Sequence, residues 1–255
     1  MVEHRLGRAM TGLIAAGLLA AGCASATTES RAAQSSSIVA LGDSVPRGTN
    51  CNCTPYPPLT AEGLAATTGR KVTATNDSVA GYTTNNVLKQ LTNEDVKAHI
   101  RKADVVEIEI GANDVAYNKT CGTSVDCYAP KVPTVKKNLL DIVRRTQSLL
   151  SGRRHLVVLL DYWSVWLGGK YAKAKGDAYV AAAEEMTDRI DTAIRSTATE
   201  TRSAYVDLRA AFKGPSYTYD ETHYLSSDGD HPNAAGHERI ASATEAVIEK
   251  RLGLG

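Results

Sequence analysis

The sequence predicts an α/β domain built as a three-layer α/β/α sandwich around a mostly parallel five-stranded sheet. Strand-like and helix-like segments alternate about five times along the chain, a pattern typical of parallel sheets covered by helices on both faces. The 255 residues, 43% of them hydrophobic, can bury one core, and nothing in the composition requires a second. Polar clusters follow several of the strand-like segments, where the ligand sites of such sheets lie.

Five short apolar segments are predicted to be strands. The first covers residues 37–41, and the plainest covers residues 156–160. In the third segment, residues 105–110, Glu107 and Glu109 place acidic side chains on one side of an otherwise apolar strand. The five segments are residues 37–41, 72–76, 105–110, 156–160 and 204–208.

Helical spacing of apolar residues predicts the segments that cover the sheet. Residues 132–150 place Val135, Leu139 and Ile142 on one face, and Gly152 ends the pattern. The predicted helices are residues 59–68, 84–91, 132–150, 177–197 and 234–252.

Residues 1–26 are predicted to be a signal peptide. Arg5 and Arg8 precede an apolar segment, residues 10–22, which is too short to span a membrane as a mature helix. We therefore expect an exported protein, either secreted or associated with the cell envelope. Residues 27–36 are expected to form a flexible tether, and residues 37–255 the folded domain.

The site of cleavage has two interpretations. Ala24-Ser25-Ala26 fits ordinary signal cleavage, whereas residues 19–23 resemble a lipoprotein signal that would place a lipid on Cys23. The lipoprotein pattern is imperfect, because Ala20 stands where a leucine is usual. The sequence predicts membrane contact only through such a lipid anchor on Cys23.

Four cysteines remain beyond Cys23: Cys51, Cys53, Cys121 and Cys127. An even number in an exported protein predicts two disulfides, with three possible connectivities. A disulfide from Cys51 to Cys53 would close a very tight ring, so we expect cross-pairing between the two loops. A zinc site is the alternative interpretation of these cysteines, and it is disfavoured because their spacing does not match that of familiar structural zinc sites.

The charge balance argues against a nucleic-acid partner. The 29 basic and 28 acidic residues nearly cancel, leaving a formal net charge of +1. No run of lysine or arginine forms a basic stripe.

Four polar clusters lie after predicted strands or before the last predicted helix. They are Gly42-Asp43-Ser44, Asn76-Asp77-Ser78-Val79-Ala80-Gly81, Gly111-Ala112-Asn113-Asp114 and Asp228-Gly229-Asp230-His231-Pro232. One such cluster is weak evidence, but the ordered set resembles the GDSL, or SGNH, serine hydrolases. The resemblance spans residues 38–248 and implies an SGNH-hydrolase, flavodoxin-like fold.

The resemblance also assigns roles. It implies that Ser44 is the nucleophile, that His231 and Asp228 complete the triad, and that Gly81 and Asn113 carry the glycine and asparagine roles. The sequence departs from the family after Ser44, where Val45-Pro46 replaces the usual leucine-containing segment.

The chemistry of these residue types agrees with those roles. A serine hydroxyl becomes nucleophilic when an imidazole takes its proton and a carboxylate orients that imidazole. The three-residue spacing lets one turn place Asp228 beside His231, whereas Asp230 should point elsewhere. The backbone N–H groups of Ser44 and Gly81 and the Asn113 amide could then bind the oxyanion.

Two tryptophans follow the fourth predicted strand and should border the site. Trp163 and Trp166 are expected to line a substrate pocket, with core packing as the alternative for one of them.

These features predict an exported serine esterase or lipase that hydrolyses carboxylic acyl esters of a lipid or an acylated glycan. The alternative is an acyltransferase or deacetylase acting on cell-envelope glycans. A non-enzymatic surface-binding protein is disfavoured by the complete set of catalytic residue types. The reaction needs no cofactor and no metal, and the sequence does not predict an oligomeric state.

Overall fold

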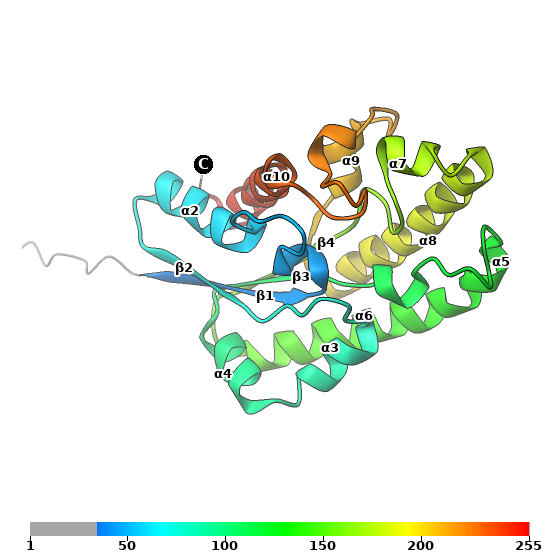
Figure 1. Ribbon diagram of the computed structural model, residues 1–255. Coiled ribbons are helices and arrows are strands. Elements are labelled where there is room, and N and C mark those ends of the chain that lie inside the picture. Colours follow the sequence, from blue (N-terminus) through cyan, green and yellow to red (C-terminus); the bar gives the residue numbers. More distant parts are fainter. Residues whose placement is uncertain (1–34, 255) are drawn as a thin grey trace, which may run out of the picture. The chain divides into compact units, whose positions relative to one another are not determined.

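The sheet has five strands in the order β2-β1-β3-β4-β5, and every neighbouring pair is parallel (Figure 1). The computed structural model describes residues 35–254, so the predicted signal peptide, Cys23 and most of the predicted tether lie outside the described residues. All five predicted strands are present. They are β1 (Ser36–Gly42), β2 (Val72–Asn76), β3 (Val105–Glu109), β4 (Leu156–Leu160) and β5 (Ala204–Val206).

Helices cover both faces of this sheet (Figure 1). On one face α2 packs against α10, and on the other α6 packs against α3, α4 and α8. The predicted three-layer architecture is therefore confirmed. The bounds of these helices are α2 (Tyr56–Thr68), α3 (Thr84–Gln90), α4 (Glu94–Lys102), α6 (Val132–Leu149), α8 (Asp177–Thr201) and α10 (Ala234–Leu252).

The sequence pattern missed one regular helix and several short ones. Helix α4 is capped by Asn93, whose side chain accepts from the N–H of Asp95 at 2.8 Å, and acidic residues occupy its first turn. The others span one or two turns, too few to show a periodicity. They are α1 (Ser44–Arg47), α5 (Val125–Tyr128), α7 (Gly169–Lys173) and α9 (Leu208–Lys213), with 3₁₀ turns η1 (Ala112–Val115), η2 (Ala129–Lys131) and η3 (Thr222–Tyr224).

The disulfides join neighbours within each loop, so the expectation of cross-pairing is wrong. Cys51 pairs with Cys53 between α1 and α2, and Cys121 pairs with Cys127 at the start of α5. The Cα atoms of the two pairs lie 5.1 and 5.7 Å apart, within the usual range for disulfides. Sequence-local pairs also close the shortest loops, so their formation orders little additional chain.

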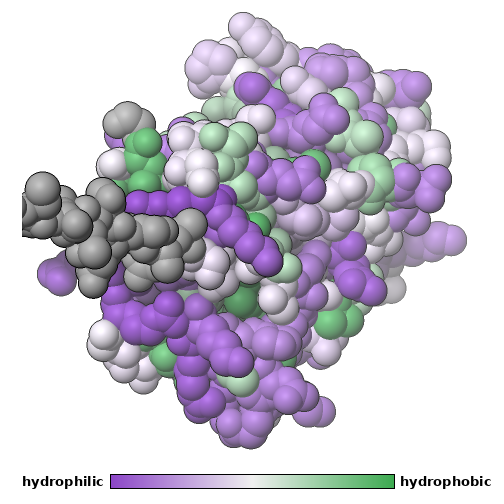
Figure 2. Space-filling model, turned by 90° about the vertical axis from the view of Figure 1, so that its left-hand side faces the viewer, coloured by the Kyte–Doolittle hydropathy of each residue, from purple (hydrophilic) through white to green (hydrophobic). Residues whose placement is uncertain are grey.

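One face of the molecule is largely polar (Figure 2). On the face at which β1 begins, hydrophilic side chains predominate and hydrophobic ones occur in small separate groups (Figure 2). Within residues 35–254, no helix combines the length and apolar character needed to cross a membrane.

The acidic side of β3 is buried rather than solvated. Glu107 and Glu109 are fully buried, because the α2 and α10 layer covers that face of the strand. Burial raises the pKa of both carboxyl groups well above the usual range, which favours their protonated form in the folded protein. Burial likewise raises the pKa of Asp43 to about 6 and that of Asp161 to about 7.

These buried acids should make the protein less stable at alkaline pH. Above their ordinary pKa they ionise in the unfolded chain but stay protonated in the folded one, so stability falls as pH rises through the raised values. Glu107→Gln/Glu109→Gln should therefore reduce the fall in free energy of unfolding between about pH 5 and about pH 9. Urea unfolding across pH measures this.

The matched control for this pH experiment is Glu94→Gln, which changes an exposed glutamate on α4. A hydrogen bond and ion pair with Lys97 lower its pKa. This change should therefore not alter how the free energy of unfolding falls with pH in the alkaline range. If Glu107→Gln/Glu109→Gln shows the same fall in free energy of unfolding with pH as the wild type, the buried pair does not control stability at alkaline pH.

Candidate active site

The strand order creates a crevice at the carboxyl ends of β1 and β3. These strands are neighbours, but the chain leaves β1 toward α2 on one face and β3 toward α6 on the other. In open parallel sheets ligands bind at such a point, where the connections diverge. Ser44 follows β1 directly and Asn113 lies in the 3₁₀ turn after β3, so both candidates stand at this crevice.

Ser44 begins the short helix α1, and the residues before it fix its position. A Cβ at Gly42 would collide with the carbonyl oxygen of Glu109, so only glycine fits where β1 approaches β3. The Asp43 side chain accepts from the N–H of Val45 at 3.1 Å and from the hydroxyl of Tyr162 at 2.7 Å. The N–H of Ser44, in the first turn, has no partner within the helix and is available to an anion.

His231 is held by Asp228 and not by Asp230. Asp228 Oδ2 lies 2.7 Å from His231 Nδ1, and Asp228 Oδ1 accepts from the backbone N–H of His231 at 3.1 Å. Asp230 Oδ2 lies 4.0 Å from the same ring nitrogen, and its side chain is 50% exposed. With Nδ1 engaged by the carboxylate, Nε2 is left to face a substrate or a serine hydroxyl.

A residue that the sequence did not indicate, Asn50, completes this pair. Its Nδ2 donates to Asp228 Oδ2 at 2.6 Å across 178 residues of sequence. Burial raises the pKa of Asp228, but hydrogen bonds from Asn50 and from the N–H groups of Asp230 and His231, together with the His231 ring, lower it to about 2. The carboxylate is therefore ionised at any ordinary pH and can support a protonated imidazole.

The loop that carries Asp228 and His231 is closed on itself. The N–H of Ser226 donates to the carbonyl of His231 at 2.8 Å, and Leu225 forms an antiparallel bridge with Pro232. Asn233 caps α10 and also donates from Nδ2 to the carbonyl of Leu225 at 3.0 Å. These bonds fix the loop that presents the imidazole.

The second and third polar clusters are joined at the crevice. Asn113 Nδ2 donates to the carbonyl of Tyr82 at 2.9 Å, which uses one of its two N–H bonds and leaves the other for a ligand. Asp114 accepts from the backbone and hydroxyl of Thr84, at 2.9 and 2.7 Å. Gly81 has φ +80, so glycine is favoured there by backbone conformation, while a Cβ would meet no atom within 4 Å.

A cavity of about 330 Å³ brings several candidates together. Ser44, Asn113 and His231 line it, together with the ionisable residues Asp43, Lys175 and Asp230. Asp228 and Gly81 do not line it: Asp228 lies behind the imidazole, and Gly81 is exposed on the neighbouring loop. Among the hydrogen bonds of the described residues, none joins Ser44 to His231. Catalytic hydrogen bonds often tighten only when substrate binds.

Aromatic side chains form one wall of the cavity. Trp163 and Trp166 both line it, and both are also buried by packing. Trp163 stacks on Phe212, with ring centroids 4.3 Å apart, whereas Trp166 donates from Nε1 to the Val115 carbonyl at 2.8 Å. The remaining aromatic members of the wall are Tyr117, Tyr162 and Tyr179.

Comparisons with known proteins agree with this arrangement. Residues 40–239 match the GDSL-like lipase/acylhydrolase family. No curated protein matches the sequence. The fold is similar to that of a lipase from a goat rumen metagenome, with 20% identity, coverage of 83% of this chain and 97% of that one, and a TM-score of 0.65.

Two further solved structures share the fold. An acetylxylan esterase from Geobacillus stearothermophilus has 23% identity, coverage of 84% of this chain and 94% of its own, and a TM-score of 0.60. A lipase/acylhydrolase from Enterococcus faecalis has 21% identity, coverage of 85% and 96%, and a TM-score of 0.57. At these identities the likeness concerns the fold.

Proposed function

The chain belongs to the GDSL-like lipase/acylhydrolase family, and we propose that it is an exported serine esterase for short acyl esters. The observation that carries this proposal is the Asp228–His231 pair, whose imidazole lines the same cavity as Ser44. Export rests on the basic and apolar pattern of residues 1–26.

In the proposed mechanism Ser44 Oγ attacks the carbonyl carbon of the ester while His231 Nε2 takes its proton. The carbonyl oxygen becomes an oxyanion, which the N–H groups of Ser44 and Gly81 and the Asn113 amide would bind. His231 then gives the proton to the departing alcohol. Water then attacks the acyl-enzyme while His231 takes a proton from it, and His231 returns that proton to Ser44 Oγ as the acid leaves. The ionised Asp228 supports the imidazolium in both halves of the reaction.

The size of the cavity favours a short acyl group. Its volume of about 330 Å³ is at the small end of the range for ligand sites, roughly 300–1,000 Å³. The buried rings of Trp163 and Trp166 close one wall, which leaves little room for a long alkyl chain.

A substrate series tests this proposal. We expect fluorophosphonate labelling of the protein, and hydrolysis of p-nitrophenyl acetate and butyrate with a kcat/KM at least about tenfold above that for the palmitate ester, a difference of about 1.4 kcal/mol. Steady-state kinetics with the three esters measure this. Absence of labelling would contradict the serine mechanism. Faster turnover of the palmitate ester would contradict only the proposed preference for short acyl groups.

A deacetylase acting on acylated glycans is the second candidate. The ring of Tyr117, which is 42% exposed beside the cavity, could stack on a sugar, and the acetylxylan esterase shares the fold. Release of acetate from acetylated oligosaccharides, compared with release from p-nitrophenyl acetate, would distinguish a glycan substrate from a simple ester.

A further inference from the structure

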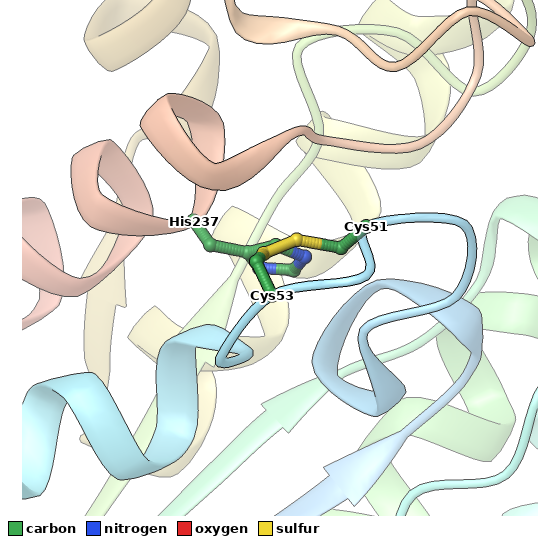
Figure 3. A group of neighbouring side chains, drawn as sticks. All are labelled: Cys51, Cys53 and His237. Carbon is green, nitrogen blue, oxygen red and sulfur yellow. A yellow bond between two sulfur atoms is a disulfide. The ribbon is translucent and has the colours of Figure 1, made fainter.

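His237 is an unpartnered histidine in the first turns of α10. It is fully buried, yet neither ring nitrogen has a hydrogen-bond partner among the residues that the structure describes. Its ring points at the Cys51–Cys53 disulfide, which approaches from the loop between α1 and α2 (Figure 3). The two sulfur atoms and a ring nitrogen all lie within 4.8 Å of one another. Buried polar groups rarely remain without a partner, so this imidazole requires an explanation.

We propose that reduction of the Cys51–Cys53 disulfide opens a zinc site whose protein ligands are Cys51, Cys53 and His237. Two thiolates and an imidazole form a donor set that suits Zn²⁺ and excludes Ca²⁺ and Mg²⁺, which prefer oxygen ligands. Ligand atoms of a tetrahedral zinc site lie roughly 3.5–3.8 Å apart. The present spacing, within 4.8 Å, is thus close to what the metal requires.

Two features prepare these ligands. Neither nitrogen of the buried His237 ring has a hydrogen-bond partner among the described residues, so the ring can offer a lone pair to a metal. The loop that holds the cysteines is anchored independently of the disulfide, because Asn50 donates to Asp228 at 2.6 Å and its carbonyl accepts from Ser226 at 3.1 Å. The cysteines should therefore stay opposite His237 after reduction.

The chemistry balances with a dithiol as the reductant. The dithiol transfers two electrons and two protons to the Cys51–Cys53 bond, which gives two cysteine thiols, and is itself oxidised to a disulfide. Zn²⁺ then displaces the two thiol protons, which go to solvent, and forms bonds to both sulfur atoms and to a ring nitrogen of His237. Both cysteines are partly exposed, so a solvent molecule can take the fourth position.

Zinc titration tests the proposal in a chain that carries Cys121→Ser/Cys127→Ser, which removes the other disulfide. After dithiol treatment we expect a single Zn²⁺ to bind per chain, measured by competition with a chromophoric chelator, and no binding before treatment. Adding Cys51→Ser/Cys53→Ser should abolish binding. Adding His237→Leu should weaken it by about 100-fold or more, since even changes outside the ligand shell cost 10–100-fold.

X-ray absorption of the zinc-loaded protein gives a second readout that needs no change at His237. We expect two sulfur ligands at about 2.3 Å and at least one nitrogen ligand at about 2.0–2.1 Å. Equal zinc affinity before and after reduction, binding that survives the loss of both cysteines, or a spectrum without sulfur would overturn the proposal. None of these measurements involves ester hydrolysis, so their outcome is independent of the proposed function.

Discussion

Replacing Ser44 with alanine is expected to lower kcat for ester hydrolysis by at least about 10³-fold and to abolish fluorophosphonate labelling. Ser44 follows β1 at the crevice and lines the same cavity as His231, so its hydroxyl is the proposed nucleophile. The stability of the fold should hardly change, because Asp43 still caps α1 through the N–H of Val45. Kinetics with p-nitrophenyl butyrate and thermal unfolding measure the two effects.

Ser164 provides the matched control, since it lines the same cavity. Its hydroxyl is engaged with the carbonyl of Leu167, at 3.3 Å, and with the N–H of Trp166, so it should not be activated. Ser164→Ala should therefore keep fluorophosphonate labelling. Turnover at the wild-type rate in Ser44→Ala would show that another group carries the reaction.

The second large effect concerns the carboxylate that supports His231. Asp228→Asn should lower kcat by up to about 10⁴-fold, because an amide cannot stabilise the imidazolium and favours the wrong ring tautomer. Asp230→Asn should lower kcat by less than about tenfold, since Asp230 lies 4.0 Å from Nδ1 whereas Asp228 lies 2.7 Å from it. Steady-state kinetics of the two variants, made and assayed together, give this ranking.

Thermal unfolding of both variants shows whether a fall in kcat reflects lost catalysis or lost stability. Asn at position 228 keeps one oxygen to accept from the backbone N–H groups that Asp228 now binds, so the loss of stability should be modest. If Asp230→Asn is the more damaging change, the triad contains Asp230 and the assignment to Asp228 is wrong.

The sequence by itself determined the layer order and the positions of the polar clusters. Short apolar segments and a 3.6-residue periodicity are local properties, so five strands and the longer helices could be predicted from neighbouring residues alone. The contact between Asp228 and His231 was predictable for the same reason, since they stand three positions apart in a single turn. Helix α4 had local signals as well, in its Asn93 cap and acidic first turn, but these were missed.

Only the tertiary structure decided which distant groups share a site. Asn50 reaches Asp228 across 178 residues, and Tyr162 reaches Asp43 across 119, and neither contact has a local pattern. The burial of Glu107 likewise depends on helices distant in the chain, α2 before the strand and α10 after it, because a strand's own sequence does not reveal whether its second face is covered. His237 meets the Cys51–Cys53 loop only because α10 packs beside α2. Such contacts arise when distant helices and strands pack together, and the spacing of residues along the chain does not show which of them will do so.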